Sequence, residues 1–178
     1  MPRPGPLSLI DRVDDRNRPV GTVRRENVFR LQANFRTVHV LVFNHADALL
    51  LQQLAPARER NPLKWGSSVA GYLHAGETYE HAAERRLEEE LGLRTPVQPV
   101  GITPMRDQGT TKFVGVYVTV ADHPKVAEPE HIAAIRFQPV DEVVQGISSH
   151  PDQYTETLRH VLNYWLERGR PGQPTLSD

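Results

Sequence analysis

The segment from Gly71 to Leu93, GYLHAGETYEHAAERRLEEELGL, most constrains what this chain can fold into. A loop with two glycines leads into a run that contains neither glycine nor proline. The run ends at Gly92, a residue type that accepts the left-handed conformation after a last helical turn. Its apolar residues recur about one helical turn apart, so that one face can pack on a sheet. These residues are Ala82, Ala83, Leu87 and Leu91. We therefore predict a glycine loop followed by a helix over 78–91.

A second face of this predicted helix is charged. Arg86, Glu89 and Glu90 are three and four residues apart and so lie on the same side. Carboxylates beside a glycine loop suit a hard cation such as Mg²⁺, which takes oxygen ligands and retains waters and substrate phosphates. The alternative is a solvated face on which Glu89 and Glu90 pair with Arg85 and Arg86 four residues earlier.

The same stretch resembles the Nudix box. The pattern of that family is Gly, five residues, Glu, seven residues, Arg-Glu-apolar, one residue, Glu-Glu, one residue, Gly-apolar. The matching positions are Gly71, Glu77, Arg85, Leu87, Glu89, Glu90, Gly92 and Leu93. Arg86 departs from the pattern, which has glutamate there. The resemblance is tight over the box and looser over residues 36–168, and it implies the family fold, an α/β/α sandwich with a mixed sheet.

The resemblance also implies a reaction. Nudix proteins typically use Mg²⁺ or Mn²⁺ to hydrolyse a nucleoside diphosphate linked to another group. By resemblance, Glu89 and Glu90 would bind the metal, with the Gly71 carbonyl group nearby, and Glu77 and Arg85 would form an ion pair that supports the loop. We therefore expect a divalent-metal-dependent hydrolase of a small diphosphate compound, in which water attacks a phosphoanhydride bond.

Arg86 leaves three interpretations open. A cation beside Glu90 competes with a metal, which would leave a non-catalytic diphosphate-binding or regulatory module. Alternatively, the guanidinium of Arg86 grips a phosphate directly in catalysis, and Glu128 or Glu130 supplies the missing oxygen ligand. The third interpretation is a changed substrate with unchanged chemistry.

The wider context resembles the branch of the family related to isopentenyl-diphosphate isomerases. The segments NFRTVHVLVFN, LLLQQL and KWGSSVAGYLHAGE follow the order of that branch. Its isomerases need a cysteine just before the box glycine and a metal-binding histidine just after it. Here these positions hold Ala70 and Tyr72, and the chain has no cysteine. Without the proton-transferring cysteine, isomerisation is not expected.

Several residues outside the helix are candidates for contact with a substrate. Arg58, Arg60 and Lys64 lie in a polar loop ahead of the glycine loop, and we expect Arg58 and Lys64 to meet a diphosphate at the pocket mouth. The alternative is that these charges only keep the loop soluble. Tyr72 is a further candidate for substrate binding. His39, in an apolar strand, is expected to be a core residue and not a ligand.

Length and composition favour one domain over residues 7–168, with a flexible arm at 1–6 and a flexible tail at 169–178. The domain should begin with a hairpin of strands at 7–13 and 20–24. Segment 26–33 is a short helix or a loop. Further strands are expected at 37–43, 48–54, 65–70, 97–105, 111–120 and 132–138, with helices starting near 139 and covering 154–168. The last helix should pack inside the domain, and a homodimer face is the alternative.

The charge balance limits the partners. The formal net charge of −1 gives no reason to expect a nucleic-acid polymer or a membrane as partner. No signal-like segment stands at the beginning of the sequence, which predicts a cytoplasmic protein. Phosphate binding must therefore come from a local cluster of cations.

Overall fold

The computed structural model describes residues 9–174 of the chain. The predicted arm at 1–6 and the last four residues of the predicted tail lie outside this range. The strands are β1 (Leu9–Val13), β2 (Pro19–Arg24), β3 (Phe35–Phe43), β4 (Ala48–Leu54), β5 (Trp65–Gly66), β6 (Val69–Tyr72), β7 (Gln98–Asp107), β8 (Thr110–Val120) and β9 (Ile132–Pro139). The helices are α1 (Tyr79–Leu91), α2 (Val140–Ser149) and α3 (Glu156–Glu167), with 3₁₀ turns at Arg25–Asn27 and Pro151–Gln153.

A seven-stranded mixed sheet forms the centre of the molecule. Its order is β5-β4-β3-β8-β7, with β6 also paired to β3 and β9 to β4. The apolar strand β3 lies parallel to β8 from Phe35–Lys112 to Phe43–Val120, and the other pairings are antiparallel. Strands buried on both faces are rich in apolar residues, which is why β3 could be recognised from its sequence as a strand.

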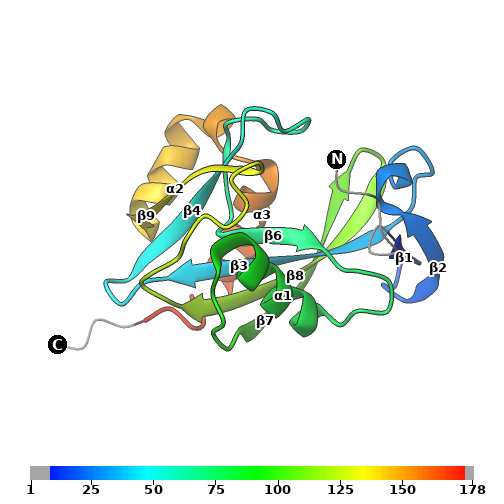
Figure 1. Cartoon of the computed structure of the whole chain (residues 1–178), viewed down its shortest axis with the longest axis horizontal. Coiled ribbons are helices and arrows are strands. Elements are labelled where there is room, and N and C mark those ends of the chain that lie inside the picture. Colours follow the sequence, from blue (N-terminus) through cyan, green and yellow to red (C-terminus); the bar gives the residue numbers. More distant parts are fainter. Residues whose placement is uncertain (1–8, 175–178) are drawn as a thin grey trace.

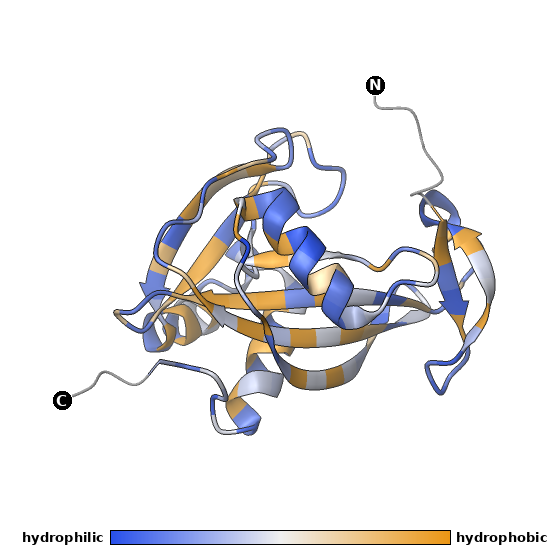
Figure 2. Cartoon of the chain, turned by 60° about the horizontal axis from the view of Figure 1, so that its bottom comes forward, coloured by the Kyte–Doolittle hydropathy of each residue, from blue (hydrophilic) through white to orange (hydrophobic). Residues whose placement is uncertain are grey.

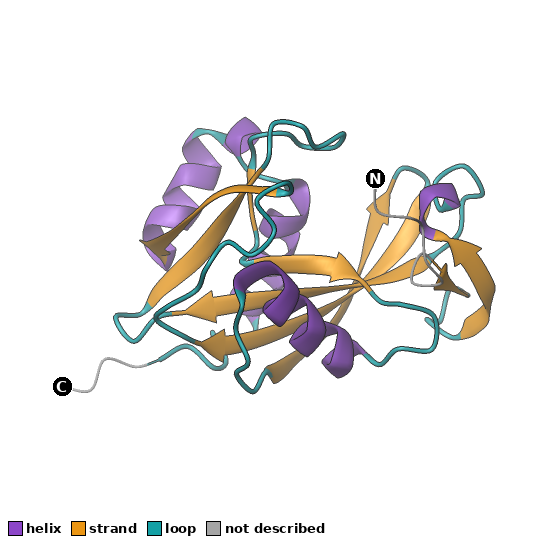
Figure 3. Cartoon of the chain, in the orientation of Figure 1, coloured by secondary structure: helices purple, strands orange, loops and turns teal. Residues whose placement is uncertain are grey.

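Helices cover both faces of this sheet, so the predicted α/β/α sandwich is confirmed (Figures 1 and 3). Helix α1 packs on one face through Ala82, Ala83, Leu87 and Leu91, all of them buried. Helices α2 and α3 cover the other face, where Trp165 of α3 stacks on Phe43 of β3. The hairpin of β1 and β2 forms a separate two-stranded sheet at the opposite end of the molecule from α2.

The ends of α1 follow from its sequence. The Thr78 side chain accepts a hydrogen bond from the backbone N–H of His81, and Gly92 ends the helix with a φ of 65°. Figure 2 shows that the outward side of α1 is hydrophilic, whereas the strands beneath it are largely hydrophobic. The periodicity of the apolar residues was therefore sufficient to predict how the helix is oriented on the sheet.

The sheet splits between β3 and β4. These two strands pair only at Phe43–Leu49, after which β6 takes the place beside β3, and β5 and β9 pair with β4. The predicted strand at 65–70 is thus two short strands on different neighbours. Ser68 spans the split, because its Oγ donates to the carbonyl oxygen of Leu50 and accepts from the N–H of Val42.

Several elements differ from expectation at their ends, and α3 is one of them. Helix α3 begins two residues later than predicted, since the Thr155 side chain caps it by accepting from the N–H of Leu158. Beyond α3, Trp165 donates its indole N–H to the carbonyl oxygen of Pro171 at 2.9 Å, and Gln173 donates to the side chain of Asp47. The apolar residues of α3 are buried within the domain, as predicted, and they are Leu158, Val161, Leu162 and Trp165. Among residues 9–174, no helix has the length and apolar character needed to span a membrane.

We predict that Trp165→Ala lowers the free energy of unfolding by about 3–5 kcal/mol, because it removes a fully buried aromatic ring and leaves a cavity. Urea unfolding followed by circular dichroism measures the change. The exposed Val144 of α2 provides the control, since Val144→Ala should change the stability by less than about 0.5 kcal/mol. A small effect of Trp165→Ala would mean that α3 is not anchored by this ring.

Candidate functional site

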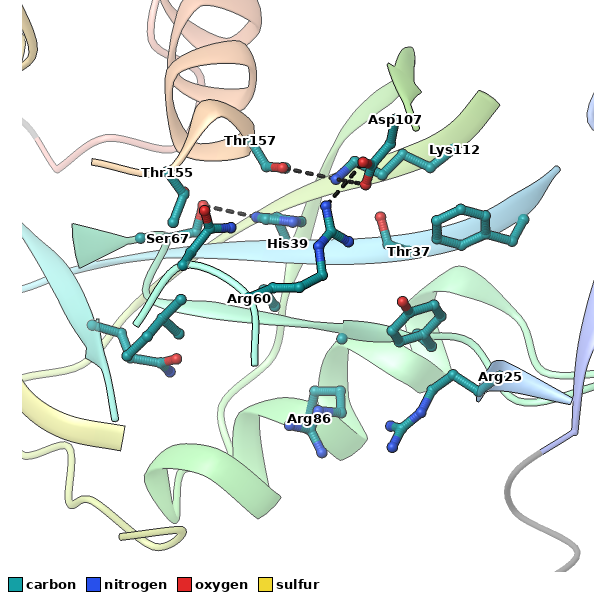
Figure 4. Close-up of a pocket in the computed structure, with 18 of the residues that line it drawn as sticks. Arg25, Thr37, His39, Arg60, Ser67, Arg86, Asp107, Lys112, Thr155 and Thr157 are labelled. Carbon is teal, nitrogen blue, oxygen red and sulfur yellow. Dashed lines mark hydrogen bonds and ion pairs between the residues drawn. The ribbon is translucent and has the colours of Figure 1, made fainter. Parts of the chain in front are cut away.

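A cavity of about 370 Å³ opens where the sheet splits. Its walls come from β3, β4, β5 and β6, from the start of β8, from the loop between β4 and β5, and from the charged face of α1. Figure 4 shows Arg86 on one side of this cavity and Lys112 with Asp107 on the opposite side. The glycine loop and the helix of the Nudix box therefore form one wall of a pocket.

Arg86 lies at the centre of the carboxylates of the box. Its guanidinium is 2.6 Å from Glu89, 3.4 Å from Glu90 and 3.1 Å from Glu128 in the loop before β9. The Nε atom makes no hydrogen bond with any described residue, so the contact with Glu90 is an ion pair without hydrogen-bond geometry. One positive charge thus holds three carboxylates together.

Gly71 makes room for Arg86. A Cβ atom at position 71 would lie 2.6–2.8 Å from Nε, Cδ and Cγ of Arg86, closer than real contacts allow. Glycine is therefore required where the arginine side chain crosses β6. The structure thus gives the box glycine a steric role, in addition to the carbonyl contact expected from the sequence.

Glu90 is buried, with 3% of its surface exposed. Its carboxylate accepts hydrogen bonds from the side-chain amide of Gln52 at 3.0 Å and from the N–H of Ala70 at 3.2 Å. Burial raises the pKa of Glu90 to about 7, although Arg86 opposes the shift. Glu89 differs, since 41% of its side chain is exposed and it lines the cavity.

The predicted ion pair between Glu77 and Arg85 is present. Arg85 donates two hydrogen bonds of 2.8 Å to the Glu77 carboxylate and a third, of 3.0 Å, to the carbonyl oxygen of Tyr72. Burial opposes ionisation of Glu77, but hydrogen bonds from Arg85, from the His74 backbone and from His81 lower its pKa to about 2. This pair fixes the glycine loop to α1.

The residues predicted to bind substrate are distributed over two cavities. Arg58 and Tyr72 line the cavity at Arg86, where Tyr72 stacks on Phe35 at 5.3 Å and lies beneath the guanidinium of Arg25. Lys64 lines a neighbouring cavity and not this one. Of the two predicted additional carboxylates, Glu128 reaches Arg86, whereas Glu130 is exposed.

Several polar contacts of the cavity were not predicted, although Arg60 was a candidate for contact with a substrate. Arg60 forms a 2.9 Å ion pair with Asp107, which also pairs with the buried Lys112 at 3.2 Å. His39, expected in the core, is indeed buried but also lines the cavity, where its Nδ1 atom is 2.8 Å from Ser67 Oγ. His39 is 28 residues from Ser67 and Arg60 is 47 residues from Asp107, so no local pattern could have grouped them.

The box carboxylates of this structure do not fit a metal ion. Among residues 9–174, no three histidine, aspartate or glutamate side chains are grouped as a metal ion requires. The guanidinium of Arg86 occupies the space between Glu89, Glu90 and Glu128, so an ion shared by these carboxylates would compete with it. A metal could be held here only if Arg86 moved away.

The α/β/α sandwich and the glycine loop with its charged helix define a protein of the Nudix class. The family model described as "NUDIX domain" matches residues 33–163. The chain therefore belongs to the Nudix family, whose members are typically enzymes that act on small diphosphates with divalent metals.

The relatives of this chain are named after more than one activity. An isopentenyl-diphosphate Delta-isomerase of Pectobacterium atrosepticum is 29% identical over 169 residues, which is 90% of this chain and 94% of the relative. An uncharacterized Nudix hydrolase of Pseudomonas aeruginosa is 32% identical over 130 residues, covering 72% and 77% of the two chains. The crystal structure of DR0079 from Deinococcus radiodurans shares the fold, with a TM-score of 0.74 and 22% identity over 87% of this chain and 97% of that one.

We predict that Gly71→Ala destabilises the protein by about 1–3 kcal/mol, because the added methyl group displaces the Arg86 side chain. The loss should be smaller when Arg86→Ala is already present, and unfolding of the four proteins of this double-mutant cycle measures the coupling. Gly66→Ala is the control, since a Cβ there would meet Thr155 at an ordinary 3.5 Å. Equal costs of Gly71→Ala in both backgrounds would contradict the steric role.

We predict that His39 makes the protein acid-sensitive. Burial lowers the pKa of His39 from 6.5 to about 3. Between these values the unfolded chain binds a proton that the folded chain does not, so stability present above about pH 6.5 is lost as the pH falls toward about 3. His39→Gln should reduce the change of the unfolding free energy with pH by up to about 1.4 kcal/mol per pH unit between about pH 6.5 and 4.5. Urea unfolding at several pH values measures this change. An unchanged pH dependence of the unfolding free energy in His39→Gln would show that His39 is protonated in the folded protein as well.

Proposed function

We propose that this protein binds a small diphosphate compound in the cavity beside α1, and that arginine side chains neutralise the phosphates. The charge of the cavity lining carries this proposal. Six positively charged side chains line it, against the two carboxylates of Glu89 and Asp107. The positive residues are Arg25, Arg58, Arg60, Arg85, Arg86 and Lys112. Four of these cations already pair with carboxylates in or behind the lining, whereas Arg25 and Arg58 form no ion pair among the described residues. The remaining positive charge in a concave site favours a small anion.

Arg86 and Arg58 are the residues proposed to contact the diphosphate. Arg58 forms no ion pair with a carboxylate among the described residues, so its charge is available to a ligand. Arg86 is bound to Glu89 at the rim, and a phosphate oxygen can replace that exposed carboxylate as its hydrogen-bond partner. In this binding mode the guanidinium supplies charge that the family usually obtains from a metal.

Isomerisation is not proposed, although several relatives are named as isomerases. Ala70 and Tyr72 hold the two positions at which the isomerase branch is expected to have cysteine and histidine. Ala70 contributes only its backbone N–H, which donates to Glu90. The chain contains no cysteine that could replace the proton-transferring group.

We predict that pyrophosphate binds to the protein in the presence of a chelator, measured by isothermal titration calorimetry. Arg86→Gln and Arg58→Gln should each weaken binding by about 10-fold or more, because each removes a charge-assisted hydrogen bond. Arg94→Gln is the matched control, since Arg94 is 82% exposed and pairs only with Glu88 in the described structure. Pyrophosphate binding that requires Mg²⁺, or that is unchanged in Arg86→Gln, would overturn the proposal.

The second candidate is the metal-dependent hydrolase expected from the box. The position of Glu89 favours it, because this carboxylate is exposed to the cavity and lies near Glu90 and Glu128 around a single guanidinium. Displacement of Arg86 by a ligand would free the carboxylates of Glu89, Glu90 and Glu128 from the cation that they share. Mg²⁺ or Mn²⁺ would then add the charge needed to activate water and neutralise phosphate.

Arg86→Glu separates the two candidates. We predict that Mg²⁺ raises the melting temperature of this variant but not that of the wild type, because the change removes the competing cation and adds an oxygen ligand. Arg94→Glu introduces the same charge change outside the cavity and should not respond to Mg²⁺. If Mg²⁺ instead raises the melting temperature of the wild type as much as that of Arg86→Glu, the metal-dependent hydrolase is favoured.

A further inference from the structure

A second cavity, of about 410 Å³, lies directly beside the first. The two share Arg60, Asn61, Asp107, Lys112 and Thr157 in their linings. Two contacts hold Arg60 in the shared wall: it reaches across to Asp107 (Figure 4), and its guanidinium lies 4.8 Å from the ring centroid of Phe29. A ligand that spans these shared residues would contact both cavities.

The second cavity is positively charged. Arg60, Lys64, Arg106 and Lys112 line it, against two carboxylates, those of Asp107 and Glu156. Asp107 is occupied by two of these cations, Arg60 and Lys112. Lys64 and Arg106 form no ion pair with any carboxylate in residues 9–174.

Lys112 brings a buried charge to the wall between the cavities. Only 8% of its surface is exposed, and its ammonium group donates to Asp107 and, at 2.8 Å, to the hydroxyl of Thr157. Burial lowers the pKa of Lys112, and Asp107 opposes this shift. Because Arg60 competes for the same carboxylate, an additional anion beside Lys112 would be stabilising.

We propose that the second cavity binds a further phosphate group, carried by the far end of the same ligand whose diphosphate lies at Arg86. The assignment to one ligand rests on the proposed function and on the shared wall. Lys64 and Arg106 are the residues that would contact this additional phosphate. The ligand is then a diphosphate compound with a separate phosphate elsewhere, a class that excludes isopentenyl diphosphate, which has only its diphosphate.

The anion site is tested first with inorganic phosphate. We saturate ¹⁵N-labelled protein with pyrophosphate, titrate phosphate, and follow the backbone amide signals of Lys64, Arg106 and Thr157 by NMR. These signals should shift, and Lys64→Gln should weaken the phosphate affinity by about 10-fold. Lys125→Gln is the matched control, because this exposed lysine lies outside both cavities. The absence of a shift, or an equal affinity in Lys64→Gln, would overturn the second site.

The single-ligand claim is tested with a matched pair, ADP-ribose and ADP-ribose 2′-phosphate. The additional phosphate should tighten binding by about 10-fold in the wild type, and Lys64→Gln should abolish this gain. Equal affinities for the pair, together with a phosphate response at Lys64, would overturn the claim that one ligand fills both cavities. Failure of pyrophosphate to bind would overturn the proposed function and this claim together, while the response of Lys64 to phosphate would still report on the second cavity.

Discussion

The ion pairs of Arg86 hold the site together. The guanidinium contacts two carboxylates of its own helix and a third from the loop before β9, while its stem crosses β6 at Gly71. Helix, strand and loop are therefore joined through one side chain. Removing a partner from such a buried group is costly, because it leaves an uncompensated charge. The position of α1 on the sheet depends on apolar packing, but the shape of the cavity depends on this cluster.

The split of the sheet places the cluster beside open space. A continuous sheet would pair β4 with β3 along its whole length and leave no cavity there. Here β4 leaves β3 after Phe43–Leu49, and Gln52 on β4 reaches the Glu90 carboxylate across the split. The same strand thus helps to form the cavity and satisfies the buried acid at its edge.

Much of the fold could be predicted from local patterns, and part of the site could not. The apolar repeat of α1 and the pairing of Glu77 with Arg85 depend on residues close in sequence. Lys64 was grouped with Arg58 because both lie in one loop. The chain turns sharply between them, with positive φ at Asn61 and Leu63, and this directs Lys64 to the other cavity. The pairing of Arg60 with Asp107 joins residues 47 positions apart, which no local spacing reveals.

Arg86 could be expected to remain fixed on its carboxylates, since releasing it would leave buried charge behind. Glu90 changes that balance. Because burial raises its pKa to about 7, this carboxyl group can take up a proton near neutral pH when Arg86 turns toward a phosphate. Glu89 is exposed and keeps its ion pair with Arg85 at 3.1 Å. Only Glu128 then retains an unpaired negative charge, and it is part of a surface loop. The arrangement thus allows one guanidinium to exchange carboxylate partners for phosphate oxygens at a moderate free-energy cost.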